Sequence, residues 1–490
     1  MSPDEAPAPK SRGWLRLLIA FVVAFDAAAF FQWADGAFQS EFGGHPEEAQ
    51  NYLAGLRMHE ALVHARDRES AGGKISAAAE SGRKWGFSLM LGGWMTVFGK
   101  SRIAVLLFMA VLAAATATLI FCAVRRELGG WAAAVASLLW LCAPAARGSY
   151  ETVLPELLGA FILTGAGLLW ARRIDGGSLG RTAASKWIHT AALLGGAGVL
   201  AVAVAAAQKI TPGDPHAAWA FLNECISVPG IAVAVFAVAG IVMSPRSDVR
   251  GGAVWIAMVA LVAGVLFSSW MKAGVPDVRV LIVATPALAM LAARGAISLA
   301  RIVAPQPVIA RENPRRNALW LFLLLLLALP PDLLSPWQKA WSGFGPAALA
   351  VVEESRGPAR VLVVSDARGE GMFLSEFAMR DREGKITVER GSETLADSSD
   401  PASRDARQRF LEDEQLFAHL TAGRIQYIVL DSAVPGDSRA GYHDQVRRVL
   451  EDNVRSFWPI CDSPVVRDGE PRGHPLRIFR VMQLPGAELR

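Results

Sequence analysis

Long apolar runs separated by short polar segments fill residues 14–334. The first run covers residues 15–34, and similar runs follow at 103–124, 131–146, 153–170, 188–206, 228–243, 254–270, 280–299 and 319–329. A helix needs roughly 20 apolar residues to cross a bilayer, so this pattern predicts a polytopic, all-α membrane bundle of about nine spans.

One apolar run, residues 85–99, is too short for a span. If it crossed the membrane, Arg125 and Arg126 would lie outside, against the positive-inside rule. Trp85 and Trp94 are typical of the membrane–water boundary. We therefore expect an interfacial helix within a large outer loop, residues 35–102.

Basic residues indicate the topology of the remaining spans. With residues 85–99 in the interface, the arginine- and lysine-rich loops at 172–186, 246–250 and 301–316 all fall inside. This places the polar tail 1–13 in the cytoplasm and the segment after residue 334 outside.

Residues 335–490 are more charged and contain no spanning run. Short β-branched runs at 360–364, 386–389, 425–430 and 476–481 alternate with helical patterns near 370–380, 405–421 and 438–456, which predicts an extracytoplasmic α/β domain. The polar loop Ser365–Gly371 follows the first strand. It is either a ligand-binding loop at a strand's carboxyl end or a turn with a helix cap.

Composition supports this division. The chain has 490 residues, of which 52% are hydrophobic and 19% charged, too apolar for a single soluble fold. The net charge is only +4, and the basic residues are scattered between the apolar runs and do not form one patch, which argues against nucleic-acid binding. The four cysteines, Cys122, Cys142, Cys225 and Cys461, lack metal-ligand spacing, so we expect neither structural zinc nor a disulfide framework.

Carboxylates and cations gather on the predicted outer surface: Glu47, Glu48, Arg57, Arg83, Lys84, Arg147, Glu151, Glu156, Lys209, Lys272 and Arg279. A carboxylate can deprotonate an acceptor hydroxyl while a cation neutralises a departing phosphate, the division of labour of glycosyl transfer from a lipid phosphate. Glu47 and Glu48 are equally consistent with a plain helix start, because acidic residues complement the helix dipole there. The same alternative applies to Glu156.

Several motifs occur in the order found in one family. Residues 47–56 read Glu-Glu-Ala-Gln-Asn-Tyr-Leu-Ala-Gly-Leu, residues 98–99 Phe-Gly, residues 125–129 Arg-Arg-Glu-Leu-Gly, and residues 279–288 Arg-Val-Leu-Ile-Val-Ala-Thr-Pro-Ala-Leu. Over roughly residues 14–300 this order resembles the GT-C superfamily of polyprenyl-phosphate-sugar-dependent glycosyltransferases, in particular bacterial relatives of protein O-mannosyltransferases and of the lipid A aminoarabinose transferase.

The resemblance implies a glycosyltransferase in the bacterial inner membrane, with its C-terminal domain in the periplasm. Glu47 would be the base, or Glu48 if the pair is spaced differently from the tyrosine, and Glu151 and Glu156 would form a second acidic, acceptor-side group. Arg279, Lys84 and Arg57 would bind the donor phosphate. The partners would be a polyprenyl-phosphate-linked sugar, membrane lipid and an acceptor lipid, glycan or protein. The resemblance implies no definite cofactor, and the carboxylates are compatible with a divalent ion.

Two other functions fit the same sequence. A transporter or flippase would hold acids within its spans, as Asp26 and Glu224 suggest, but most acids here lie at one predicted surface. A catalytically degenerate scaffold would act through the C-terminal domain.

Overall fold

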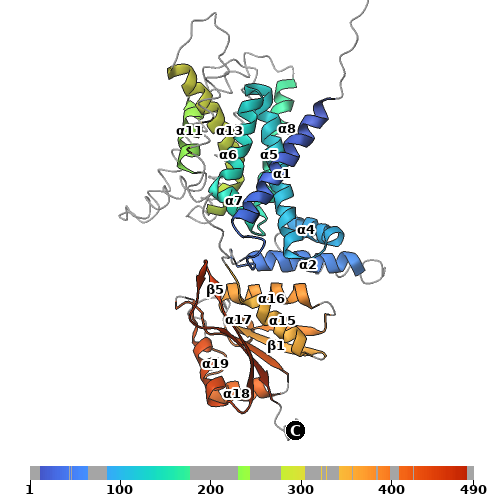
Figure 1. Cartoon of the computed structure of the whole chain (residues 1–490), viewed down its shortest axis with the longest axis vertical. Helices are drawn as coiled ribbons and strands as arrows, with labels where there is room; N and C mark the ends of the chain where they lie inside the picture. Colours follow the sequence, from blue (N-terminus) through green and yellow to red (C-terminus); the bar gives the residue numbers. More distant parts are fainter. Residues whose placement is uncertain are drawn as a thin grey trace, which may run out of the picture. The chain divides into compact units, whose positions relative to one another are not determined.

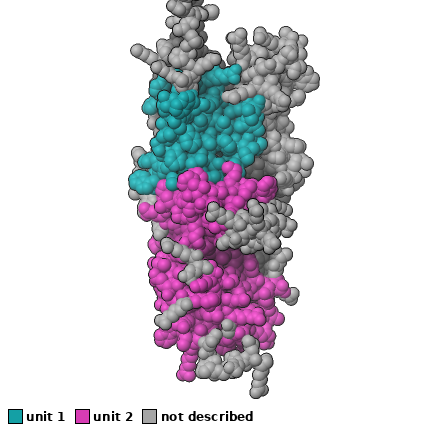
Figure 2. All heavy atoms as spheres, turned by 90° about the vertical axis from the view of Figure 1, so that its right-hand side faces the viewer, with its two compact units in different colours: residues 1–34, 107–151, 155–336 teal, residues 35–106, 152–154, 337–490 magenta. Residues whose placement is uncertain are grey.

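The structure is a computed structural model that describes residues 12–43, 45, 47–64, 85–176, 230–242, 278–303, 341–355, 357–381, 384–397, 408–422, 424–436 and 438–482, with residues 322 and 327 singly. The chain divides into two compact units, coloured separately in Figure 2. Unit 1 comprises residues 1–34, 107–151 and 155–336, and unit 2 comprises residues 35–106, 152–154 and 337–490.

Unit 1 is helical (Figure 1). Its elements are α1 (Arg12–Ala34), most of α5 (Arg102–Leu128), α6 (Gly130–Cys142), α7 (Pro144–Glu151), α8 (Glu156–Gly176), α11 (Ile231–Val242) and α13 (Val278–Val303). Three helices in the described residues are long and apolar enough to cross a membrane, at Trp14–Ala34, Arg102–Leu128 and Ile282–Leu299. The chain is therefore a membrane protein by the length and composition of these helices.

The described residues contain three helices of span length, or four spans if one bent pair is counted as a single span, and the total of nine stays a prediction. The run at 131–146 is two helices, α6 and α7, bent by 63°, which count as a fourth span if taken together. Ala143 is extended at the break because Pro144 disfavours a helical residue before it. The apolar parts of α8 and α11 are shorter than a span. The expected spans at 188–206 and 254–270, and nearly all of 319–329, lie outside the described residues, as does Glu224.

Helix α13 is the centre of packing in unit 1. It crosses α11 where Gly240 faces Gly295, and a Cβ atom at either glycine would collide with a backbone carbonyl of the other helix. Trp140 of α6 donates a hydrogen bond to the Thr285 hydroxyl of α13 at 3.1 Å. Close backbone approach at small residues and polar contacts between helices are typical of membrane bundles. Asp26 is exposed on α1.

The N-terminal part of unit 2 contains the helices α2 (Glu48–His64) and α4 (Trp85–Phe98). They pack closely because Gly55 of α2 lies against the Leu91 side chain and Gly92 of α4 against Met58 and His59. Helix α4 has 14 residues and ends before α5 begins, so the predicted short helix is confirmed. Trp85 and Phe98 are exposed on it. Its place in the membrane interface stays a prediction.

The rest of unit 2 is a three-layer α/β domain. Five strands form the sheet in the order β2-β1-β3-β7-β4, with bounds β1 (Ala359–Val364), β2 (Ile386–Arg390), β3 (Tyr427–Asp431), β4 (Phe457–Ser463) and β7 (Leu476–Val481). Strands β2, β1 and β3 are parallel, and β7 is antiparallel to both β3 and β4. A separate hairpin comprises β5 (Val466–Arg467) and β6 (Glu470–Pro471).

Helices cover both faces of the sheet. Helices α15 (Phe344–Glu354) and α16 (Ala367–Arg380) share one buried cluster with it, and α18 (Asp413–Thr421) and α19 (Gly441–Asp452) share the other. The short α17 (Gly391–Thr394) follows β2. All four strands predicted from the sequence are confirmed. The sequence misses β4, whose edge position and Pro459 hide the strand pattern.

Candidate functional site

The predicted acidic pair lies at the beginning of α2. Glu48 is its first residue and is 3% exposed. The Glu48 carboxylate accepts a hydrogen bond from the Val153 N–H at 3.3 Å, and Asn51 donates its amide to the Val153 carbonyl at 2.9 Å. Glu47 is half-buried just before the helix, and its N–H donates to Nδ1 of His45 at 3.1 Å. Both carboxylates thus occupy the positive end of the helix dipole, and Glu48 also has a structural partner.

Tyr52 anchors the next turn of α2. Its side chain is fully buried, its hydroxyl donates to the Lys100 carbonyl at 2.9 Å, and its ring lies 5.0 Å from that of Phe42. Burial raises the pKa of the Tyr52 phenol. The hydroxyl therefore stays protonated and fixes α2 against the segment that leads into α5.

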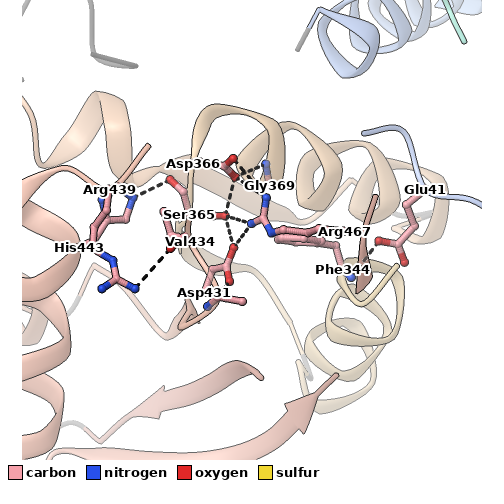
Figure 3. A network of polar contacts seen from close by, with 11 residues as sticks. Glu41, Phe344, Ser365, Asp366, Gly369, Asp431, Val434, Arg439, His443 and Arg467 are labelled. Atoms are coloured by element: carbon pink, nitrogen blue, oxygen red, sulfur yellow. Dashed lines mark hydrogen bonds and ion pairs between the residues drawn. The ribbon is translucent and has the colours of Figure 1, made fainter. Parts of the chain in front are cut away.

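Glu41 caps a helix of the C-terminal domain. Helix α15 begins after Gly343, which has no side chain to satisfy the first helical amides. The Glu41 carboxylate accepts hydrogen bonds from the N–H groups of Gly343, Phe344 and Gly345 at 3.1, 3.0 and 2.8 Å. Figure 3 shows this carboxylate beside Phe344. A buried anion at a helix N-terminus is stabilised by both the hydrogen bonds and the helix dipole.

The other predicted site residues are distributed over the chain. Arg57 is exposed on α2, and Lys84 lies outside the described residues. Glu151, Glu156 and Arg279 belong to unit 1. Glu48 and Arg57 lie on α2, nine residues apart, and Glu47 directly precedes this helix. The prediction that all these groups form a single site stays a prediction.

Within unit 1, Glu151 and Glu156 have different surroundings. Glu151 ends α7 and pairs with Arg147, whose Nε lies 3.6 Å from the carboxylate. Arg147 is itself buried and lies 5.4 Å from the centre of the Phe31 ring. Glu156 is the first residue of α8, in accord with a helix-start role.

A second polar cluster lies at the carboxyl ends of β1 and β3. The chain leaves β1 for β2 on one side and reaches β3 on the other, so this is the switch point where open α/β sheets bind ligands. Ser365 and Asp366 follow β1, and Asp431 ends β3. Asp366 also caps α16 by accepting the Gly369 N–H at 2.9 Å.

Arg467 occupies this switch point. It comes from the β5–β6 hairpin and is 2% exposed. Its guanidinium donates to both carboxylate oxygens of Asp366, at 3.1 and 3.2 Å, and to Asp431, as Figure 3 shows. The Ser365 hydroxyl donates to Asp431 at 2.5 Å. A cation of the chain itself thus binds both carboxylates at the switch point, and within the Ser365–Gly371 loop Asp366 serves as the cap of α16.

His443 completes the cluster from α19. Its Nε2 lies 2.9 Å from the Ser365 carbonyl oxygen and its Nδ1 2.9 Å from the Ala440 N–H nitrogen. The described residues contain no group of three or more His, Cys, Asp or Glu side chains arranged to hold a metal ion.

Glu370 is a buried acid next to this cluster. Its carboxyl group accepts hydrogen bonds from the Ser392 N–H at 2.8 Å and from the Ser392 hydroxyl at 2.5 Å. Burial raises its pKa to about 8, although the bonds from Ser392 act in the opposite direction. The group therefore carries a proton at neutral pH.

Sequence reasoning missed four of these residues: Glu41, Asp431, His443 and Arg467. Arg467 precedes Asp468-Gly469, a dipeptide typical of hairpin turns, with φ of 52° and 78°. That signal predicts the hairpin but not the destination of its arginine. No local sequence pattern identifies Glu41, because the helix that it caps begins more than 300 residues later in the chain. Only tertiary folding brings the two together.

No protein-family model matches the chain, and a comparison with curated proteins gave no match.

Proposed function

We propose that the chain is an integral-membrane glycosyltransferase that transfers a sugar from a polyprenyl phosphate to an acceptor on the outer face of the bacterial inner membrane. The observation that carries the proposal is the acidic pair at the N-terminus of α2, in a folded segment between two candidate spans, α1 and α5. A donor with a lipid tail would present its phosphate and sugar at such a membrane surface. The C-terminal domain is then periplasmic.

Glu47 is the better base of the two. Glu48 is almost fully buried and accepts the Val153 N–H, whereas Glu47 is more accessible. In the proposed step, the Glu47 carboxylate takes the proton of the acceptor hydroxyl, whose oxygen attacks the anomeric carbon. The bond from that carbon to the phosphate oxygen breaks, and the polyprenyl phosphate leaves as an anion. A single displacement of this kind inverts the anomeric centre.

The leaving phosphate requires a cation. We assign this role to Arg279, Lys84 and Arg57, of which Arg57 lies on α2, the helix that begins at Glu48. Glu151 and Glu156 would bind the acceptor. A polyprenyl-phosphate sugar is the proposed donor, and a lipid, glycan or protein hydroxyl is the acceptor.

The test is turnover by the purified full-length chain in a lipid nanodisc, with a radiolabelled polyprenyl-phosphate sugar as donor. Glu47→Gln removes the base while keeping the side-chain size, so we expect kcat to fall about 10²- to 10⁴-fold with donor binding retained. Glu60→Gln, on the exposed side of the same helix, is the matched control and should behave as wild type.

Glu48→Gln separates the roles within the pair. If Glu48 is structural, this variant should lose less activity than Glu47→Gln. A larger loss in Glu48→Gln would transfer the role of base to Glu48. Absence of donor binding and turnover in the wild type would overturn the proposal.

A membrane-anchored scaffold is the second candidate. It is favoured by the switch point of the C-terminal sheet, where Asp366 and Asp431 are already bound by Arg467 of the same chain. In that case Glu48 serves only to bind Val153. The same assay distinguishes the two functions, because a scaffold neither binds the lipid donor nor depends on Glu47.

A further inference from the structure

Helix α16 of the C-terminal domain lies directly against the start of α2. A Cβ atom at Gly371 would lie 2.8 Å from the Cβ of Ala49, closer than such atoms approach in proteins. Ala49 is the residue after Glu48. Only glycine at position 371 therefore allows α16 its present distance from the acidic pair.

The chain before the acidic pair is held by the same domain. At Gly43, an added Cβ would lie 2.6 Å from the sulfur of Met372 and 2.8 Å from the Trp341 ring. Both neighbours belong to the buried cluster beneath α15 and α16. The acidic pair is thus flanked on both sides, at Gly43 and at Ala49, by residues packed on the C-terminal domain.

One ion pair and one hydrogen bond join α16 to residues 100–102, and a second ion pair lies within α16 itself. Glu376 of α16 is 1% exposed and binds both Arg102 and Arg380, the latter at 2.5 Å. Lys100 donates to the Ala378 carbonyl at 2.7 Å. Buried charges are tolerated only when their partners are held in good geometry, so these contacts specify one placement of α16 against residues 100–102.

We propose that α16 is the positioning element of the acidic segment and that Gly371 is its key positioning residue. The inference rests on the proposed transferase function and extends it, since it gives the C-terminal domain a role in the membrane reaction. A general base must be placed to within a fraction of an ångström, and a shift of about 1 Å can cost about 10²-fold in rate. Donor binding does not depend on this contact.

The experiment adds one methyl group on the α16 side of the contact and then removes the opposing methyl group on the α2 side. Gly371→Ala adds a Cβ against Ala49 and should lower kcat about 10- to 100-fold, with KM for the lipid donor changed less than about twofold. Adding Ala49→Gly to this variant removes the opposing methyl and should restore at least half of the wild-type kcat. The helix itself cannot account for the loss, because alanine favours helix more than glycine does.

The control is Gly473→Ala, which introduces the same methyl group in the same domain, where no atom lies within 4 Å. It should match wild type in both parameters. A fall in kcat that Ala49→Gly does not reverse, or no fall at all in Gly371→Ala, would overturn the proposal.

A second readout is independent of catalysis. Hydrogen exchange in the full-length chain should become faster at residues 47–56 in Gly371→Ala and return to the wild-type rate in the double variant, while β1 and β3 remain protected. If the wild type transfers no sugar, the function fails but this exchange result still tests the positioning. Unchanged exchange at residues 47–56 in Gly371→Ala would contradict it.

Discussion

Arg467 is the residue on which the polar interior of the C-terminal domain depends. Asp366 and Asp431 are 9% and 1% exposed, and this one guanidinium binds both. Removing one partner of a buried ion pair leaves an uncompensated charge, at a cost of about 3–5 kcal/mol. The network therefore stabilises the C-terminal domain, at the position in the sheet where other α/β proteins bind ligands.

Replacing this arginine tests that conclusion. Arg467→Met keeps much of the side-chain volume but removes the charge, so the domain should lose about 3–5 kcal/mol of unfolding free energy. The measurement is hydrogen exchange of the β1 and β3 amides in the full-length chain. Arg472→Met, at an exposed position after the same hairpin, should leave exchange unchanged. Equal protection in the two variants would show that the buried carboxylates do not need Arg467.

Glu370 makes the stability of the C-terminal domain depend on pH. Its pKa is about 8 in the folded state against an ordinary value of 4.5, because burial disfavours the charged form. At a pH between 4.5 and about 8, Glu370 is protonated in the folded domain but has released its proton in the unfolded chain. The free energy of unfolding should therefore fall as the pH rises from about 4.5 to about 8, by up to about 1.4 kcal/mol per pH unit.

The variant Glu370→Gln resembles the protonated acid and should remove this part of the slope. Protection of β1 amides, corrected for the intrinsic pH dependence of exchange, should decrease between pH 6 and pH 8 in wild type and change less in Glu370→Gln. Glu451→Gln, at an exposed position of α19, serves as the control. The same slope in all three proteins would assign the pH dependence to another group.

At the scale of elements, α15 shows how one helix can depend on a distant segment. Its own N-cap residue is Gly343, at φ 123°, and its first amides are bound by Glu41 instead. We expect Glu41→Ala to leave three buried N–H groups without their acceptor, at about 1–3 kcal/mol for each buried group. Faster exchange at residues 344–347 would show the loss.

The control for this element is Glu353→Ala, at the exposed C-terminal end of α15. A negative charge at that end opposes the helix dipole, so its removal should not destabilise the helix. If the two variants exchange alike at residues 344–347, the cap is not required for α15.

The sequence predicted most helices and strands of the C-terminal domain, but not the residues that cap the helices and not the edge strand β4. Strands β1, β3 and β7 agree with the predicted runs because their mostly buried residues give a clear apolar pattern. Strand β2 also agrees, although it lies at an edge and is only partly buried. Strand β4 lies at an edge, where only part of the strand is buried and Pro459 is tolerated. Pro144 similarly divides a continuous apolar run into α6 and α7, which composition alone does not reveal.

At the scale of the whole molecule, the main difference lies in the grouping of segments. The sequence places residues 35–102 with the spans, as an outer loop of residues 14–334. The structure places residues 35–106 in one compact unit with residues 337–490. Glu41, Lys100 and Arg102 make this connection through contacts to α15 and α16. Under the proposed function, these contacts would give the C-terminal domain a structural means to influence the reaction.

The sequence by itself determined which segments are apolar enough for a membrane, where the α/β domain begins, and which acidic pair opens α2. These features are local, because hydrophobic periodicity and helix-start residues act within a few turns of chain. Tertiary structure alone decided that Arg467 fills the switch point, that Glu41 caps α15 and that Gly371 faces Ala49. Each of these contacts joins residues far apart in the chain, where burial and charge compensation select partners that no local pattern specifies.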